Sequence, residues 1–112
     1  MSCLLILSAC GSKWDQDKLI GQWEVKTWQI VSSEEDMDGK MDFTFKADNR
    51  YSVDYGTETE EGKYWTYGDY LHTVEDGAAE KKVRIIQLNG STIEFEMNRA
   101  GQLENVVLVR KE

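Results

Sequence analysis

The feature that most constrains the fold of this chain is an alternation of apolar and polar residues with period two, which begins at Trp23. Neighbouring side chains of a strand point to opposite faces, so this period predicts strands with one buried face. The alternation slips where Trp28 and Ile30 continue the apolar set, which indicates a bulge in the first strand. Further strands are expected at about residues 41–46, 51–55, 63–67, 69–74, 82–88, 92–97 and 103–110.

The connections between these segments are short and rich in Gly, Asn and Asp. Asn89-Gly90 and Gly68-Asp69 are two-residue hairpin signals. No connection could hold a crossover helix, so about eight short strands should form an antiparallel meander. Such a sheet leaves two exposed edges unless it closes, and we therefore expect an all-β, up-and-down barrel. A two-sheet sandwich, which would need longer Greek-key connections, is the alternative.

The first twelve residues have the layout of an export signal. An apolar stretch from Leu4 to Leu7 runs into small residues and Cys10. The four residues LSAC, which end at Cys10, resemble the lipobox of bacterial lipoproteins. In that family the cysteine becomes the first mature residue and carries acyl chains. The resemblance implies that Cys10 is a lipid anchor, which three acyl chains would make firm.

This resemblance also implies a division of the chain. Residues 1–9 would be a signal peptide, residues 10–13 a lipidated tether and residues 14–112 the folded domain. The expected location is the bacterial cell envelope, with the protein anchored in the outer membrane on its periplasmic or surface side. Cleavage would remove Cys3 and acylation would block Cys10, so no thiol would remain for a disulfide, a nucleophile or a metal.

The start of the domain carries a second resemblance. A short amphipathic helical segment is expected from Trp14 to Ile20, with Ser12 as its N-cap and Gly21 as its C-cap residue. A short helix followed by Gly-x-Trp at the opening of the first strand resembles the lipocalin and lipocalin-like superfamily. The similarity is greatest to the compact lipocalin-like domains of bacterial lipoproteins, and it spans roughly residues 14–111. Further similarities to this superfamily lie in the segments DFTF, GKYW and LVR.

The superfamily resemblance implies a barrel whose closed end is plugged by the motif tryptophan. That residue is Trp23 here, and a basic side chain of the last strand, Arg110 or Lys111, would lie over its ring in a cation–π contact. Both residues of such a pair would be structural.

The expected interior is crowded with large side chains. Strands of about six residues make a barrel only ~20 Å tall, and bulky inward residues leave it little empty volume. We therefore expect a shallow aromatic mouth or no pocket rather than a large cavity. The inward residues of this phasing are Trp23, Phe43, Phe45, Tyr51, Tyr55, Phe95 and Met97. A small hydrophobic ligand, if one binds, is expected to contact Trp28, Phe43, Phe45, Tyr51, Tyr55, Trp65 and Phe95.

Charge and motif content argue against several classes of function. The chain has 13 Lys and Arg against 21 Asp and Glu, a formal charge of −8, so a nucleic-acid partner is not expected. His72 is the only histidine, and it has no partner residues in the sequence for a catalytic triad or a zinc site. Residues 34–42 have the spacing of the first half of a calcium loop, but Phe45 stands where its last carboxylate belongs. No enzyme activity, cofactor or metal site is expected.

These observations favour a non-catalytic, membrane-anchored, monomeric lipocalin-like lipoprotein that holds a small hydrophobic molecule at the barrel mouth. The alternative is a protein-interaction or inhibitor module that docks a basic partner through acidic loops. Its acidic surface would combine two loops at one rim, with the residues Asp36, Asp38, Glu58, Glu60 and Glu61.

Overall fold

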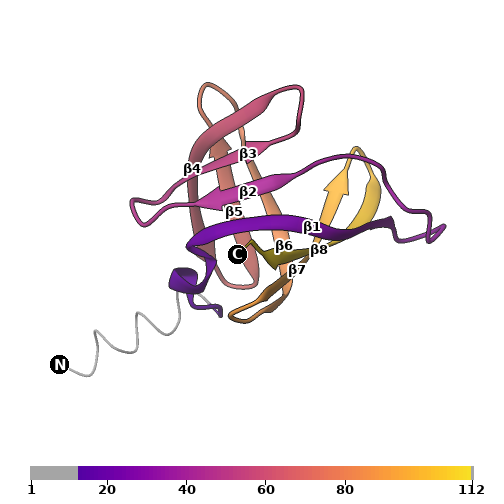
Figure 1. Ribbon diagram of the computed structural model, residues 1–112, viewed down its shortest axis with the longest axis horizontal. Helices are drawn as coiled ribbons and strands as arrows, with labels where there is room; N and C mark the ends of the chain where they lie inside the picture. The colour runs from indigo at the N-terminus through magenta and orange to yellow at the C-terminus, as the bar shows by residue number, and fades with distance from the viewer. Residues whose placement is uncertain (1–12, 112) are drawn as a thin grey trace.

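Every strand pairs antiparallel with the next one along the chain, and the last strand pairs with the first, so the sheet closes on itself (Figure 1). The computed structural model describes residues 13–111. The predicted eight-stranded up-and-down barrel is confirmed, and closure excludes the sandwich. The elements are the 3₁₀ helix η1 (Gln16–Leu19) and the strands β1 (Gly21–Ile30), β2 (Asp42–Phe45), β3 (Arg50–Asp54), β4 (Thr59–Tyr67), β5 (Tyr70–Glu75), β6 (Glu80–Leu88), β7 (Thr92–Arg99) and β8 (Gln102–Arg110).

Two irregularities change the facing of side chains. The register of β1 against β8 shifts between Val25 and Thr27, which confirms the bulge indicated by the slipped alternation. A second shift, between Ile85 and Gln87, lies in the ladder of β6 and β7. It leaves Ile85 in the core while Ile86 is partly exposed on the outside.

The barrel wall also opens between β6 and β7. Their ladder ends at the pair Arg84–Glu96, although β6 begins at Glu80 and β7 continues to Arg99. Beyond that pair, β6 stays with β5 and β7 stays with β8. The β5–β6 and β7–β8 hairpins consequently diverge, as Figure 1 shows.

The core consists of inward side chains from all eight strands, together with Leu19 of η1 and Met41, which precedes β2. Within it the rings of Phe43 and Phe45 stack at 5.6 Å, and Phe43 and Phe95 meet edge to face at 6.0 Å. Full burial of one such side chain is worth about 1.5–3 kcal/mol, so these rings are a large part of the driving force. Among residues 13–111, the fifteen buried apolar residues are Leu19, Trp23, Met41, Phe43, Phe45, Tyr51, Val53, Tyr64, Leu71, Ile85, Leu88, Ile93, Phe95, Val106 and Leu108.

The closed end of the barrel is sealed by Trp23, which is fully buried. Its indole N–H donates to the carbonyl oxygen of Leu19 at 2.8 Å, so η1 lies directly across the end. The guanidinium carbon of Arg110 lies 4.2 Å from the centre of the Trp23 ring. Nη1 of Arg110 also donates to the carbonyl of Ile20, and a β-carbon at Gly21 would lie 2.2 Å from that nitrogen. The glycine of the Gly-x-Trp motif therefore makes room for the arginine that covers the tryptophan.

Some details of this end differ from the sequence interpretation. The N-cap of η1 is Asp15, whose carboxylate accepts from the amide of Asp17. The expected cap, Ser12, and the expected anchor, Cys10, lie outside the described residues. The ammonium group of Lys111 donates to the carboxylate of Asp42 at 3.3 Å and does not cover the Trp23 ring. In residues 13–111 no helix has the length and apolarity needed to span a membrane.

Candidate functional site

Two adjoining cavities lie at the end of the barrel opposite Trp23, where β1 ends and β2 begins. The inner one, of about 100 Å³, penetrates the core, and the outer one has a volume of about 530 Å³. Both are lined by Met41, Tyr55, Lys81, Val83 and Met97, so they form one continuous depression. The inner cavity adds Phe43, Tyr51, Val53, Glu60, Thr73 and Phe95, and the outer one adds Trp28, Lys82, Asn98 and Arg99.

Five of the seven ligand-contacting residues expected from the sequence line this depression, Trp28 in its outer part and four in its inner part: Phe43, Tyr51, Tyr55 and Phe95. Phe45 does not reach it. Its ring lies deeper, in edge-to-face contact with Tyr64 at 4.9 Å. The interior is crowded as expected, and the open volume is at the mouth.

Trp65 is the clearest correction. Its ring stacks on His72 at 5.2 Å, across the β4–β5 ladder. Because Tyr64 points into the core, its neighbour Trp65 must point to the outer wall. Trp65 therefore cannot contact a molecule inside the mouth.

A buried carboxylate forms part of the wall of the inner cavity. Glu60 is 8% exposed and accepts hydrogen bonds from the hydroxyl groups of Tyr51 and Tyr55, the latter at 2.9 Å. Nζ of Lys81 lies 3.5 Å from the same carboxylate. Burial, followed by the hydrogen bonds to Glu60 and its charge, raises the pKa of both tyrosines. The two phenols consequently stay protonated and keep donating to Glu60.

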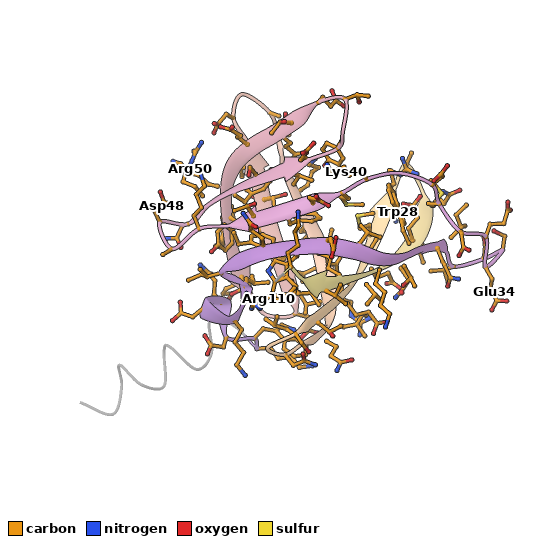
Figure 2. All side chains as sticks on the ribbon, in the orientation of Figure 1. Trp28, Glu34, Lys40, Asp48, Arg50 and Arg110 are labelled. Atoms are coloured by element: carbon orange, nitrogen blue, oxygen red, sulfur yellow. The ribbon has the colours of Figure 1, made fainter. Side chains whose placement is uncertain are left out.

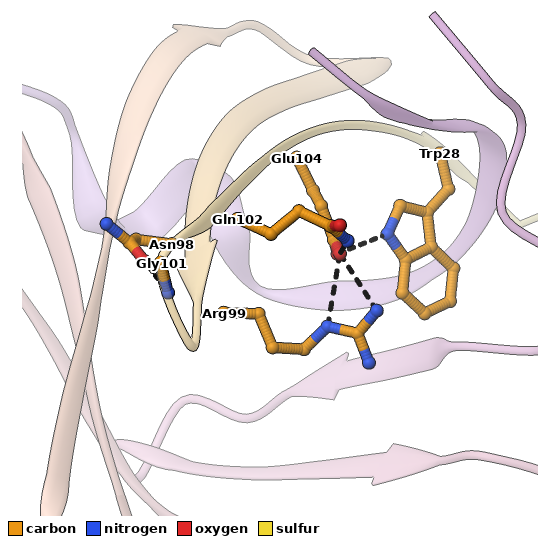
Figure 3. Close-up of polar contacts among 6 residues, drawn as sticks. All are labelled: Trp28, Asn98, Arg99, Gly101, Gln102 and Glu104. Atoms are coloured by element: carbon orange, nitrogen blue, oxygen red, sulfur yellow. Dashed lines mark hydrogen bonds and ion pairs between the residues drawn. The ribbon is translucent and has the colours of Figure 1, made fainter. Parts of the chain in front are cut away.

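A second buried carboxylate lies at the rim. Glu104 is fully buried, and its Oε1 accepts from the indole N–H of Trp28 at 2.8 Å (Figure 3). Its Oε2 accepts from Nε and Nη2 of Arg99, at 3.2 and 2.8 Å, and from the amide of Gln102 at 2.6 Å. The Arg99 guanidinium also lies 5.7 Å from the centre of the Trp28 ring. These contacts fix Trp28 against the β7–β8 hairpin.

The electrostatics of this cluster are dominated by its donors. Burial by itself raises the pKa of Glu104, but the hydrogen bonds from Arg99, Trp28 and Gln102 outweigh it and hold the pKa below its ordinary value. Glu104 is therefore a carboxylate at neutral pH.

Sequence reasoning missed both buried carboxylates, because it treated acidic residues as solvated. The phase of the alternation carried the signal. In β8, Glu104 lies two residues before the buried Val106, so it points inward as Val106 and Leu108 do. In β4, Glu60 lies four residues before the buried Tyr64 and points inward for the same reason. Gly62 lies between Glu60 and Tyr64 and interrupts the apolar alternation, so the inward direction of Glu60 was not recognised. A β-carbon at Gly62 would lie 2.0 Å from the carbonyl oxygen of Val74, which leaves no room for a side chain there.

The buried position of Glu60 also changes the interpretation of the acidic loops as one docking surface. Glu60 points into the barrel, so it cannot belong to an exposed docking surface. Glu34 lies at the far tip of the β1–β2 loop (Figure 2), whereas Lys40 on the same loop is 3.4 Å from Asp54 of β3. Within the part of the chain that the structure describes, no three His, Cys, Asp or Glu side chains are grouped as metal ligands.

Comparisons with known proteins agree with this architecture. A family model described as a lipocalin-like domain matches residues 19–95. A solved structure of a lipocalin-like protein from Bacteroides uniformis superposes with a TM-score of 0.65 at 16% identity, covering 84% of this chain and 99% of that chain. At that identity the likeness shows the fold alone. Among curated proteins, no sequence matches this chain.

Proposed function

The chain belongs to the lipocalin-like domain family, and on that premise we propose that it is a non-catalytic binding protein whose barrel mouth holds a small hydrophobic molecule. The observation that carries the proposal is the outer cavity of about 530 Å³. Sites for small molecules have volumes of roughly 300–1,000 Å³ and walls that are mostly apolar with a few polar groups. The mouth fits that description.

The shape of the depression limits how a molecule would lie in it. The inner cavity, at about 100 Å³ and with Phe43 and Phe95 in its lining, has room for only a small apolar group. The body of the molecule would occupy the outer cavity, against Met41, Val83 and Met97. Each methylene removed from water there contributes about 0.8 kcal/mol, so a molecule with several apolar carbons gains enough to bind.

Filling the mouth should abolish this binding. We expect N-phenyl-1-naphthylamine, a neutral dye that fluoresces in apolar surroundings, to bind the native chain, and Val83→Trp to weaken its affinity at least tenfold. Val83 lines both cavities, so an indole there takes up the space. Val31→Trp is the matched control, because Val31 is already exposed and lines neither cavity. Equal affinities in the three proteins, measured by fluorescence titration, would place the dye elsewhere.

We also propose that the protein is anchored in a bacterial envelope membrane through Cys10. The described chain begins at Lys13, whose amide donates to the carbonyl oxygen of Gly68 in the β4–β5 turn at 3.0 Å. A segment of three residues spans at most about 11 Å. Acyl chains on Cys10 would therefore hold the barrel close to the membrane by this turn.

Loss of the anchor has a direct readout. Cys10→Ser is expected to move the protein from the membrane fraction to the soluble fraction of a bacterial expression host, because no acyl chain can be attached. Cys3→Ser is the matched control and should leave the protein in the membrane fraction. Retention of the Cys10→Ser variant in washed membranes would refute lipidation at this residue.

A further inference from the structure

The carboxylates of the mouth already use their acceptor atoms inside the protein. Both oxygens of Glu104 accept hydrogen bonds, from Trp28, Arg99 and Gln102. Both oxygens of Glu60 accept from tyrosine hydroxyls. A molecule that enters the mouth thus meets two buried carboxylates whose oxygens already accept hydrogen bonds.

Two of the three cations that line the outer cavity, Lys81 and Arg99, in contrast keep donors available. The Lys81 ammonium has three N–H donors, and among residues 13–111 it contacts one carboxylate oxygen, at 3.5 Å. The Lys81 side chain is 58% exposed. Arg99 uses Nε and Nη2 on Glu104, which leaves Nη1 without an acceptor in the described residues, and its side chain is 55% exposed.

Lys81 and Arg99 stand on either side of the opening in the barrel wall, whereas the third cation of the outer cavity, Lys82, lies over the Tyr70 ring. Lys81 belongs to β6 and Arg99 to β7, beyond the pair Arg84–Glu96 where the ladder of these strands ends. Both line the outer cavity, together with the apolar side chains of Val83 and Met97. The gap therefore has an apolar floor and a cation on each strand that borders it.

Building on the proposed function, we propose that the bound molecule is an amphipathic anion, with its apolar part in the mouth and its carboxylate, sulfonate or phosphate group between Lys81 and Arg99. The charged side chains that keep hydrogen-bonding capacity at the rim, Lys81 and Arg99, are donors, so a head group that supplies acceptors fits them. Hydrogen bonds from cations to an anionic group are stronger than neutral ones, which favours a charged head group over a hydroxyl. The chain as a whole carries −8 and repels anions, so binding of an anion depends on these local cations.

A pair of dyes that differ by one sulfonate tests this directly. The anionic 8-anilino-1-naphthalenesulfonate and the neutral N-phenyl-1-naphthylamine share one ring system. We expect Lys81→Met to weaken binding of the anionic dye about tenfold and to leave the affinity for the neutral dye within about twofold. Lys81→Arg, which keeps the charge, should retain the native affinity for the anionic dye. Lys63→Met removes one charge from the outer face of β4 and should change neither affinity.

The outcomes separate the inference from the proposed function. Binding of both dyes with no effect of Lys81→Met on either would overturn the anionic head group and leave the binding function standing. A parallel loss of both dyes in Lys81→Met would also overturn it, because the lysine would then support the cavity rather than the charge. Binding of neither dye by the native chain would refute the proposed function itself. Lys81→Gln replaces Lys81→Met if circular dichroism shows the methionine variant unfolded.

Discussion

Replacement of Trp23 by alanine is expected to lower the free energy of unfolding by about 3–5 kcal/mol, the range of large aromatic truncations in a core. The indole is fully buried, and it is the surface on which Arg110 lies. Its loss leaves a cavity behind η1 and removes the donor to the Leu19 carbonyl. Urea denaturation followed by circular dichroism measures the change.

Trp65→Ala provides the matched control for that experiment. Trp65 lies on the outer wall against His72, so its removal exposes little and should lower the free energy of unfolding by less than about 1 kcal/mol. Similar losses in the two variants would show that Trp23 is not the plug of the closed end.

The second large effect is expected at Glu104. Glu104→Gln keeps the size of the side chain but replaces an acceptor oxygen by a donor in the midst of Arg99, Gln102 and Trp28. Hydrogen bonds to charged groups contribute about 1.5–3 kcal/mol, and a loss of this size in the free energy of unfolding should follow. The β7–β8 hairpin should also loosen, which faster amide hydrogen exchange around residues 99–102 would reveal.

The same substitution should flatten the response of the protein to acid. The folded state lowers the pKa of Glu104, so its stabilising contribution is present above the pKa that glutamate has in the unfolded chain. It is lost as pH falls through that value and through the folded one. Glu104→Gln should therefore lose less stability than the native chain between neutral and acidic pH. Glu24→Gln on the exposed face of β1 is the control, and an equally steep loss in Glu104→Gln would contradict the assignment.

The barrel could be predicted from the sequence because its causes are local. Period-two patterning and two-residue turns fix eight antiparallel strands, and the slip before Trp28 marks a real bulge. Trp65 could not be placed, because Tyr64 and Trp65 are adjacent aromatic residues and the alternation fits either one pointing inward. Contact of Gly62 with the neighbouring strand fixes the phase there, and such contact is not visible in a single sequence.

The site was less predictable than the fold for a related reason. The opening of the site depends on the residue pair at which the β6–β7 ladder ends. The position of that pair is set by the stagger of the strands around the closed barrel. The buried Glu60 and Glu104 have the same residue type as the many exposed acids, so composition alone cannot distinguish them. Lys81 and Arg99, which border the opening, lie on different hairpins and were not singled out from the sequence.

The position of Arg110 has a consequence for biosynthesis. It donates to the carbonyl of Ile20, ninety residues earlier, and to that of Lys18, while β8 supplies the partner for both β1 and β7. A nascent chain therefore cannot complete the ring until translation has passed Arg110. Until that moment β1 and β7 keep unpaired edges, which other polypeptides can join, so a chaperone that shields such edges would be most useful to this protein before β8 has been synthesised.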